Sequence, residues 1–141
     1  MKRFLAICFL FFLVGCAQQE APVEEPPVDT QNQEQIVISS PAPNQTITSP
    51  LTVSGKARGS WFFEATAPLF VVDWDGRILS QGIIRATDDW MTEDFVDFSG
   101  EIDFEIPDDI PYRRGSIIFQ KKNPSELSQN DAAIEIPVLF Q

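Results

Sequence analysis

The 141-residue sequence contains no histidine and two cysteines, which limits the chemistry that its side chains can perform. Without histidine, neither a Ser-His-Asp nor a Cys-His nucleophile can be assembled, and the commonest zinc ligand is missing. Carboxylates are abundant, because 21 Asp and Glu face 10 Lys and Arg, for a formal net charge of −11. This acidic balance argues against a nucleic-acid partner, which requires a basic face. We therefore expect no enzyme activity and no cofactor.

Two groups of carboxylates have a spacing that could do chemistry. Asp73 and Asp75, followed by Gly76, match the first part of an EF-hand calcium loop, but Ser80 and Gly82 cannot supply its later ligands. The pair is a calcium candidate for which a turn with a solvated acidic surface is the preferred interpretation. The second group consists of Asp88, Asp89, Glu93, Asp94 and Asp97. Paired carboxylates can hydrolyse glycosides across a deep cleft, which a small domain with short loops rarely offers, so surface charge is the preferred interpretation.

Aromatic residues are the other candidates. If Trp61 and Trp90 are exposed, they could form a stacking platform for sugars or an apolar patch for a protein partner. Trp90 and Met91 lie within an acidic segment, residues 85–100, and both residue types are common in recognition surfaces. We take Trp61, Trp90 and Met91 as candidate binding residues. The preferred interpretation is that the rings close the end of a hydrophobic core.

The N-terminus reads as a targeting signal. Lys2 and Arg3 precede eleven consecutive apolar residues, Phe4–Val14. As a helix this run would cover about 16 Å, roughly half of the hydrocarbon core of a bilayer, which fits a secretory signal better than a permanent span. Leu13-Val14-Gly15-Cys16 follows, and it resembles the lipobox of bacterial lipoproteins. The resemblance implies that residues 1–15 are removed and that Cys16 receives a diacylglyceryl group and palmitate.

Two acyl chains anchor a protein stably, so we expect a lipid-anchored protein on the cell membrane or the outer membrane, with its domain outside the cytoplasm. Residues 16–35 are rich in Gln, Glu and Pro and contain no aromatic residue, so they cannot bury enough apolar surface to offset the entropy of ordering. This segment, called the tether below, is expected to be disordered and to hold the domain away from the bilayer.

Residues 36–141 have the pattern of an all-β domain. Short branched or alternating runs predict about seven strands, separated by turns such as Asp75-Gly76, which favours a hairpin. The clearest alternation is Glu101–Ile106, and no segment has a helical apolar stripe. We therefore expect an antiparallel β-sandwich. The expected strands are centred on residues 36–38, 51–57, 69–74, 77–79, 101–106, 115–122 and 134–140.

The opening of this domain, Ser39–Asn44 and then Ile47–Ala57, resembles the immunoglobulin-like domain of bacterial spore-germination lipoproteins. The resemblance implies a seven-stranded sandwich on envelope proteins, with no established catalytic residues, and it does not imply a spore-forming source. Pro41 and Pro43 are expected to form a kink between two strand pieces. Gly55 is expected to leave room for a bulky ring, with Trp61 and Trp74 as candidates.

These observations predict an envelope lipoprotein whose β-sandwich is a non-catalytic binding or scaffold module for a protein or a cell-wall polymer. The alternative is a carbohydrate-binding module that uses exposed Trp61 or Trp90. The two differ in a simple property, the exposure of those indole rings, which the sequence leaves open.

Overall fold

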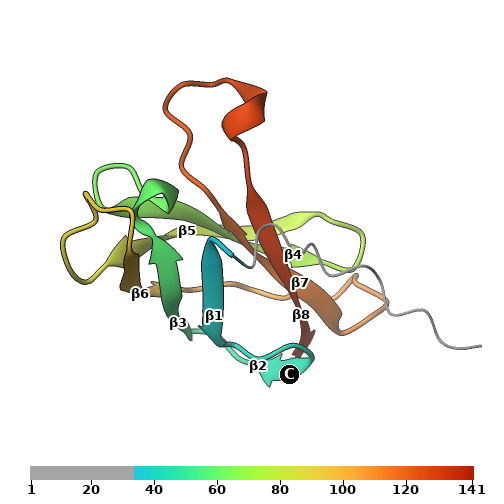
Figure 1. Ribbon diagram of the computed structural model, residues 1–141. Coiled ribbons are helices and arrows are strands. Elements are labelled where there is room, and N and C mark those ends of the chain that lie inside the picture. Colours follow the sequence, from blue (N-terminus) through green and yellow to red (C-terminus); the bar gives the residue numbers. More distant parts are fainter. Residues whose placement is uncertain (1–33) are drawn as a thin grey trace, which may run out of the picture.

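The computed structural model describes residues 34–141, and it contains only strands, turns and two short 3-10 helices (Figure 1). The expected signal peptide, the lipidation site Cys16 and nearly all of the tether lie outside the described residues. The all-β prediction is confirmed, with eight strands in place of about seven. The elements are β1 (Ile36–Ser40), β2 (Gln45–Ile47), β3 (Leu51–Arg58), η1 (Gly59–Trp61), β4 (Thr66–Asp73), β5 (Ile78–Ala86), β6 (Phe95–Ile102), β7 (Arg114–Gln120), η2 (Ser128–Asn130) and β8 (Ala133–Phe140).

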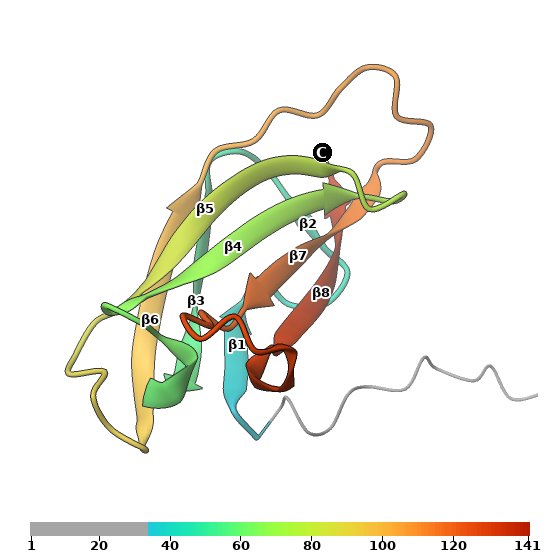
Figure 2. The same cartoon turned by 90° about the horizontal axis from the view of Figure 1, so that it is seen from above.

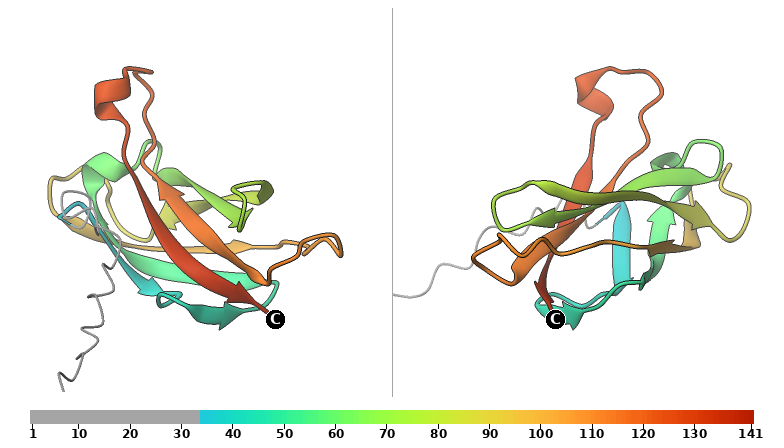
Figure 3. Two further views of the ribbon diagram at one scale, coloured as in Figure 1. Left: turned by 90° about the vertical axis from the view of Figure 1, so that its right-hand side faces the viewer. Right: turned by 180° about the vertical axis from the view of Figure 1, so that it is seen from behind.

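The strands form one continuous hydrogen-bonded sheet in the order β1-β3-β6-β5-β4-β7-β8-β2. The sheet curls on itself, so that it encloses a single core (Figures 2 and 3). The curl brings β6 against β7, although two strands lie between them in the sheet. The contact is seen in the rings of Phe98 and Phe119, whose centroids are 6.0 Å apart. β5 links the part of the sheet that contains β1, β3 and β6 to the part that contains β4, β7, β8 and β2. It pairs with β4 along most of its length but with β6 only at Arg85 and Ala86.

The first two strands occupy the two edges of this sheet. β1 pairs antiparallel with β3, whereas β2 pairs parallel with the end of β8. The connection between them, residues 41–44, contains Pro41 and Pro43, and proline cannot donate to a strand ladder. The predicted kink between two strand pieces is therefore confirmed, and it moves the chain from one edge of the sheet to the other.

The core follows from the alternation of side chains along each strand. In β3 the odd-numbered residues from Leu51 to Ala57 are buried, while Thr52 and Lys56 are exposed. Trp61, Leu69, Ile84, Ile117 and Phe119 are among the core side chains with no exposed surface.

The strand expected at residues 101–106 begins and ends earlier in the structure. β6 covers Phe95–Ile102 because its partner β3 begins at Leu51, which pairs with Ile102, and the ladder stops there. Beyond that point the alternation of burial continues without pairing, since Phe104 is buried and its N–H donates to the Ser49 hydroxyl at 3.0 Å. Side-chain alternation therefore located an inward-facing segment correctly but not its hydrogen bonding.

The ring that occupies the space over Gly55 is Phe98, not Trp61 or Trp74 as expected. Phe98 is the partner of Gly55 in the β3–β6 register, and a Cβ at Gly55 would lie 2.8 Å from its ring. The same Cβ would lie 2.3 Å from the carbonyl oxygen of Val37 in β1. Glycine at this position therefore allows an edge strand and a core ring to approach together.

Candidate functional site

Trp61, the first candidate binding residue, lies in the core. Its side chain is 0% exposed, and its carbonyl oxygen accepts a hydrogen bond of 3.0 Å from the N–H of Lys122, which follows β7. Its indole Nε1 is buried without a hydrogen-bond partner among the described residues. Trp61 is therefore not a surface binding residue, and the preferred interpretation, a ring that closes the core, applies to it.

Trp90 and Met91 lie on the loop of residues 87–94, between β5 and β6. Within residues 34–141, Met91 is the most exposed of the large apolar side chains, at 76%, and Trp90 is half-buried. The indole of Trp90 packs edge-on against the ring of Phe63, with centroids 6.4 Å apart, and Phe63 is itself exposed. Phe63, Trp90 and Met91 together are called the Trp90 surface below.

A tight turn positions Phe63. Phe63 and Thr66 exchange two backbone hydrogen bonds of 3.0 and 3.1 Å, and the two residues between them, Glu64 and Ala65, have positive φ angles of 52° and 58°. This is the geometry of a two-residue type I′ hairpin, in which both central residues are left-handed. The turn therefore holds Phe63 rigidly beside the Trp90 loop.

The Trp90 loop is held by its own short side chains and by Gly59. Asp89 accepts a hydrogen bond from the N–H of Met91 at 3.0 Å, and Thr92 N–H donates to the Trp90 carbonyl oxygen at 2.9 Å. A Cβ at Gly59 would lie 2.2 Å from that same carbonyl oxygen, so only glycine allows the loop to pack this closely on η1.

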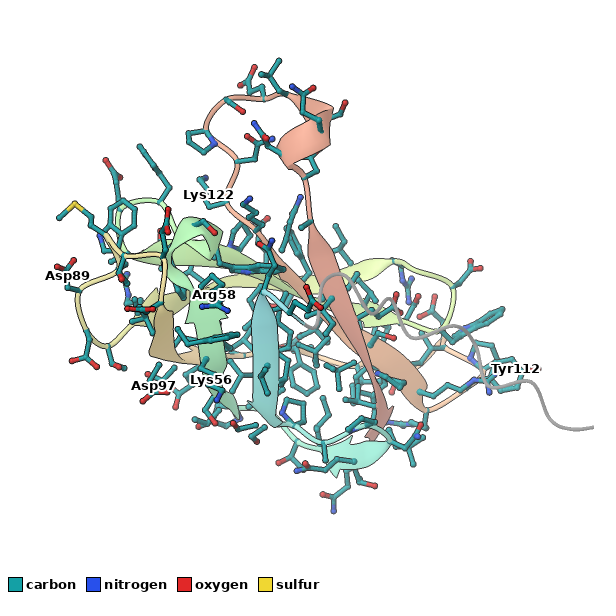
Figure 4. The ribbon with its side chains drawn as sticks, in the orientation of Figure 1. Lys56, Arg58, Asp89, Asp97, Tyr112 and Lys122 are labelled. Carbon is teal, nitrogen blue, oxygen red and sulfur yellow. The ribbon has the colours of Figure 1, made fainter. Side chains whose placement is uncertain are left out.

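The rim of the Trp90 surface is acidic. Its exposed carboxylates are Asp88, Asp89 and Glu93. The Arg58 guanidinium, at the end of β3, donates to the carbonyl oxygen of Glu93 at 3.3 Å and lies 4.2 Å from the centre of the Phe95 ring. In Figure 4, Asp89 lies at the outer tip of this loop, and Lys56 and Arg58 lie on β3. An apolar patch within an acidic rim is complementary to a basic surface with apolar anchors.

A second aromatic surface, which sequence reasoning did not identify as a site, lies at the other end of the strands. Trp74, from the β4–β5 turn, and Tyr112, from the β6–β7 loop, are 43% and 51% exposed. Their centroids are 5.1 Å apart at an interplanar angle of 80°, and the Arg114 guanidinium lies 5.3 Å from the Tyr112 ring. Trp74, Tyr112 and Arg114 are called the Trp74 surface below. A tryptophan inside a polar hairpin turn was the signal that could have pointed to it.

Asp73 organises the turn that carries Trp74. Its Oδ1 accepts hydrogen bonds from the N–H groups of Asp75 and Arg77, at 3.0 and 2.9 Å, and its Oδ2 accepts one from Arg77 Nε at 3.1 Å. Burial raises the pKa of Asp73, but these hydrogen bonds and the Arg77 charge outweigh burial, so the pKa lies below its ordinary value. Arg77 Nη2 also donates to Asp109 at 3.3 Å, which ties the β6–β7 loop to the turn.

These contacts explain the Asp73-x-Asp75-Gly76 pattern as a hairpin turn, in which Gly76 has a φ of 81°. The Asp73 carboxylate already accepts three hydrogen bonds from its own turn. Within residues 34–141, no three acidic or cysteine side chains gather closely enough to hold a metal ion. The calcium candidate therefore has no support in the geometry of this turn.

Two open hollows lie along the seam where β5 separates from β6. One is lined by Thr52, Ile83, Arg85, Ser99, Gly100 and Glu101, and the other by Ser49, Leu79, Ser80, Asp103, Phe104 and Glu105. The carboxylates suspected of hydrolytic chemistry, Asp88, Asp89 and Glu93, line neither hollow and project from the Trp90 loop instead. Their position therefore favours surface charge.

Comparison with known proteins gives one match. A family model described as the immunoglobulin-like domain of bacterial spore germination matches residues 35–125, a range that contains both the Trp90 and Trp74 surfaces. No curated protein and no solved structure matches the chain. In the described part of the chain, no helix has the length and apolar character needed to cross a membrane.

Proposed function

Because the chain belongs to the family of immunoglobulin-like domains of bacterial spore germination, we propose that it is a lipid-anchored, non-catalytic binding module of the cell envelope. Membership of this family supports a non-catalytic module, and the remaining parts of the proposal rest on the residues. The supporting features are the lipobox-like Leu13–Cys16 and an exposed Trp90 surface.

The anchor has a direct test with a matched control inside the same chain. The full chain is expressed in a bacterium with radiolabelled palmitate, alongside Cys16→Ser and Cys8→Ser. We expect the label in the wild type and in Cys8→Ser, and its complete loss in Cys16→Ser, because only Cys16 follows the lipobox pattern. Equal labelling of Cys16→Ser would refute the anchor.

The Trp90 surface carries the binding part of the proposal. Met91 is 76% exposed on a loop whose backbone is fixed by Gly59 and Asp89. A rigid loop loses little conformational entropy on binding, and Met and Trp are enriched at protein interfaces. With Asp88, Asp89 and Glu93 around it, the surface fits a protein partner that presents lysine or arginine around an apolar anchor.

A photo-crosslinking amino acid at position 91, in cells of the native host, tests this interface. The control places the same amino acid at Leu139, which is 41% exposed on β8. We expect a discrete crosslinked species from position 91, absent at position 139, and weakened at least about fivefold by Asp88→Lys, because charge reversal on an acidic rim repels a basic partner. Identical products from both positions, or insensitivity to Asp88→Lys, would contradict the interface.

A second candidate function is carbohydrate binding, which requires an exposed indole ring. Trp61 does not meet this requirement, because it is buried. Trp74, with 43% exposure and an aromatic neighbour, provides such a ring at the other end of the domain.

A further inference from the structure

We propose that the Trp74 surface binds the terminal sugar of a neutral glycan chain, with one pyranose ring against the Trp74 indole and Tyr112 as a side wall. This inference rests on the proposed role as a non-catalytic binding module, but not on the anchor or on the Trp90 surface.

The arrangement of the two rings sets the size of the ligand. Trp74 and Tyr112 are each about half exposed, so both offer ring surface to solvent. Their planes are 80° apart, with centroids separated by 5.1 Å. Two perpendicular rings cannot form one flat platform under a run of consecutive sugars. They form a corner instead, which accommodates one sugar ring with its apolar face on an aromatic face.

Hydroxyl groups require donors and acceptors next to the rings, and this end of the molecule supplies both. The Arg77 and Asp109 side chains, joined by their 3.3 Å contact, remain 48% and 74% exposed. The Asp75 carboxylate is exposed beside Trp74, and Arg114 lies over Tyr112. Planar guanidinium and carboxylate groups can each form paired hydrogen bonds with neighbouring hydroxyls.

The charges at this end favour a neutral ligand. Although the whole chain carries a formal net charge of −11, basic and acidic groups are mixed here. The groups concerned are Arg77, Arg113 and Arg114 on the basic side and Asp73, Asp75, Asp108 and Asp109 on the acidic side. A polyanion requires a field of one sign, and the Trp74 surface does not provide one.

The site is pre-organised, because hydrogen bonds join the two loops that form it. Asp73 holds Arg77, and Arg77 contacts Asp109 on the β6–β7 loop, so the turn that carries Trp74 is tied to the loop that carries Tyr112, and the two rings also contact each other. Pre-organisation lowers the entropic cost of binding, which matters most for a small ligand with few contacts. Stable protein interfaces bury about 800 Å² per partner. Three side chains at a loop tip fit a single sugar better than an interface of that size.

The location of the surface is compatible with an anchored protein. The backbone of Gln35, where the described chain begins to pair, accepts a hydrogen bond from Arg58 N–H, at the same end as Gly59 and the Trp90 loop. Figure 4 shows Asp89 of that loop and Tyr112 at opposite ends of the molecule.

The test uses the three tryptophans as internal reporters. The isotope-labelled, detergent-solubilised full chain is titrated with N-acetylglucosamine, glucose and maltose-type oligosaccharides of one to six units, and the three indole N–H signals are followed by NMR. We expect only the Trp74 signal to shift, with a dissociation constant that stops improving beyond two units, because one terminal sugar is bound. Failure of all these sugars to shift the Trp74 signal would overturn the proposal, as would affinity that keeps rising with chain length.

Variants separate binding from folding. Trp74→Ala is expected to weaken binding at least tenfold and Tyr112→Ala at least threefold, whereas Trp74→Phe retains part of the affinity and Trp90→Ala leaves it unchanged. Thermal unfolding of each variant checks the fold. If Trp90→Ala, and not Trp74→Ala, abolishes sugar binding, the assignment is wrong. If a protein is crosslinked from position 74 while no sugar binds, the Trp74 surface is a protein interface and the proposal fails. Palmitate labelling and crosslinking from position 91 test the proposed function separately.

Discussion

The three tryptophans of this chain occupy three different environments. Trp61 is fully buried in η1, Trp90 is half-buried beside Phe63, and Trp74 projects from a hairpin turn next to Tyr112. Each environment follows from the backbone around the ring rather than from the residue type. Exposure and neighbouring rings therefore decide which of the three tryptophans can contact a ligand.

Trp61 provides a stability test at the residue level. Its Nε1 is buried without a partner among the described residues, and such a group costs about 1–3 kcal/mol. Trp61→Phe removes this polar atom together with some packing, so we expect a loss of less than about 2 kcal/mol. Trp61→Ala leaves a large cavity and is expected to cost about 3–5 kcal/mol. Urea unfolding measures both values, and equal losses would show that the indole N–H has a partner.

Asp73 provides a pH test. Its pKa in the folded state lies below the ordinary value of 3.8, so its stabilising effect is present above that value and is lost as the pH falls through the folded-state pKa. Asp73→Asn keeps an acceptor oxygen but removes the charge that faces Arg77. We expect the variant to be less stable at pH 7 and to lose less stability between pH 5 and pH 2.

The matched control for Asp73 is Asp75→Asn, because Asp75 contributes its backbone N–H to the same turn. Urea midpoints measured at several pH values should give a flatter curve for Asp73→Asn than for the wild type, and Asp75→Asn shows how much of the change comes from losing any carboxylate of this turn. A curve for Asp73→Asn that runs parallel to the wild type would contradict the assignment.

At the level of elements, glycine in β3 decides whether β1 can pair. A Cβ at Gly55 would lie 2.3 Å from the Val37 carbonyl oxygen and 2.8 Å from the Phe98 ring, and the first contact is rigid backbone. We expect Gly55→Ala to cost at least about 2–3 kcal/mol and to weaken hydrogen-exchange protection in β1.

Gly82 in β5 is the matched control for Gly55. A Cβ there would lie 3.2 Å from Cδ1 of the Ile102 side chain, so a shift of a few tenths of an ångström by one side chain, without backbone movement, relieves the contact. Gly82→Ala is therefore expected to change stability by less than about 1 kcal/mol, measured by the same urea unfolding. Equal losses in the two variants would show that the β1 contact is not the cause.

The elements also show how far side-chain patterns reach. Alternation identified β3, and the two prolines between β1 and β2 were recognised as a kink. The sequence did not predict the start of β6 at Phe95. Asp97 is the exposed residue between two buried residues of this strand, but in the sequence it reads as one more carboxylate of the acidic loop. Strand ends depend on where the partner strand begins, and local sequence does not contain that information.

At the level of the whole molecule, one continuous sheet surrounds one core, so the described domain has no internal boundary. We expect a single cooperative thermal transition, with the far-ultraviolet circular dichroism of the strands and the near-ultraviolet signal of the aromatic residues changing together. The chain from residue 17 onward is suitable for this measurement. Separate midpoints for the two signals would indicate that one layer unfolds before the other.

The two aromatic surfaces lie at opposite ends of this single body, so a substitution in one is expected to leave the other unchanged (Figure 4). The two surfaces also differ in chemistry, because an acidic rim surrounds Met91 whereas basic and acidic groups are mixed around Trp74.

The sequence by itself determined the all-β class, the immunoglobulin-like family and the inward face of β3, because side-chain alternation and proline positions are local properties. Only the tertiary structure decided which aromatic rings are exposed. Trp61 and Trp74 both adjoin strand ends in sequence, but Trp61 is fully buried and its backbone bonds to Lys122 after β7, whereas Trp74 is exposed and meets Tyr112 from the β6–β7 loop. Exposure depends on contacts between segments about 40–60 residues apart in sequence, and no local pattern specifies which segment will cover a given ring.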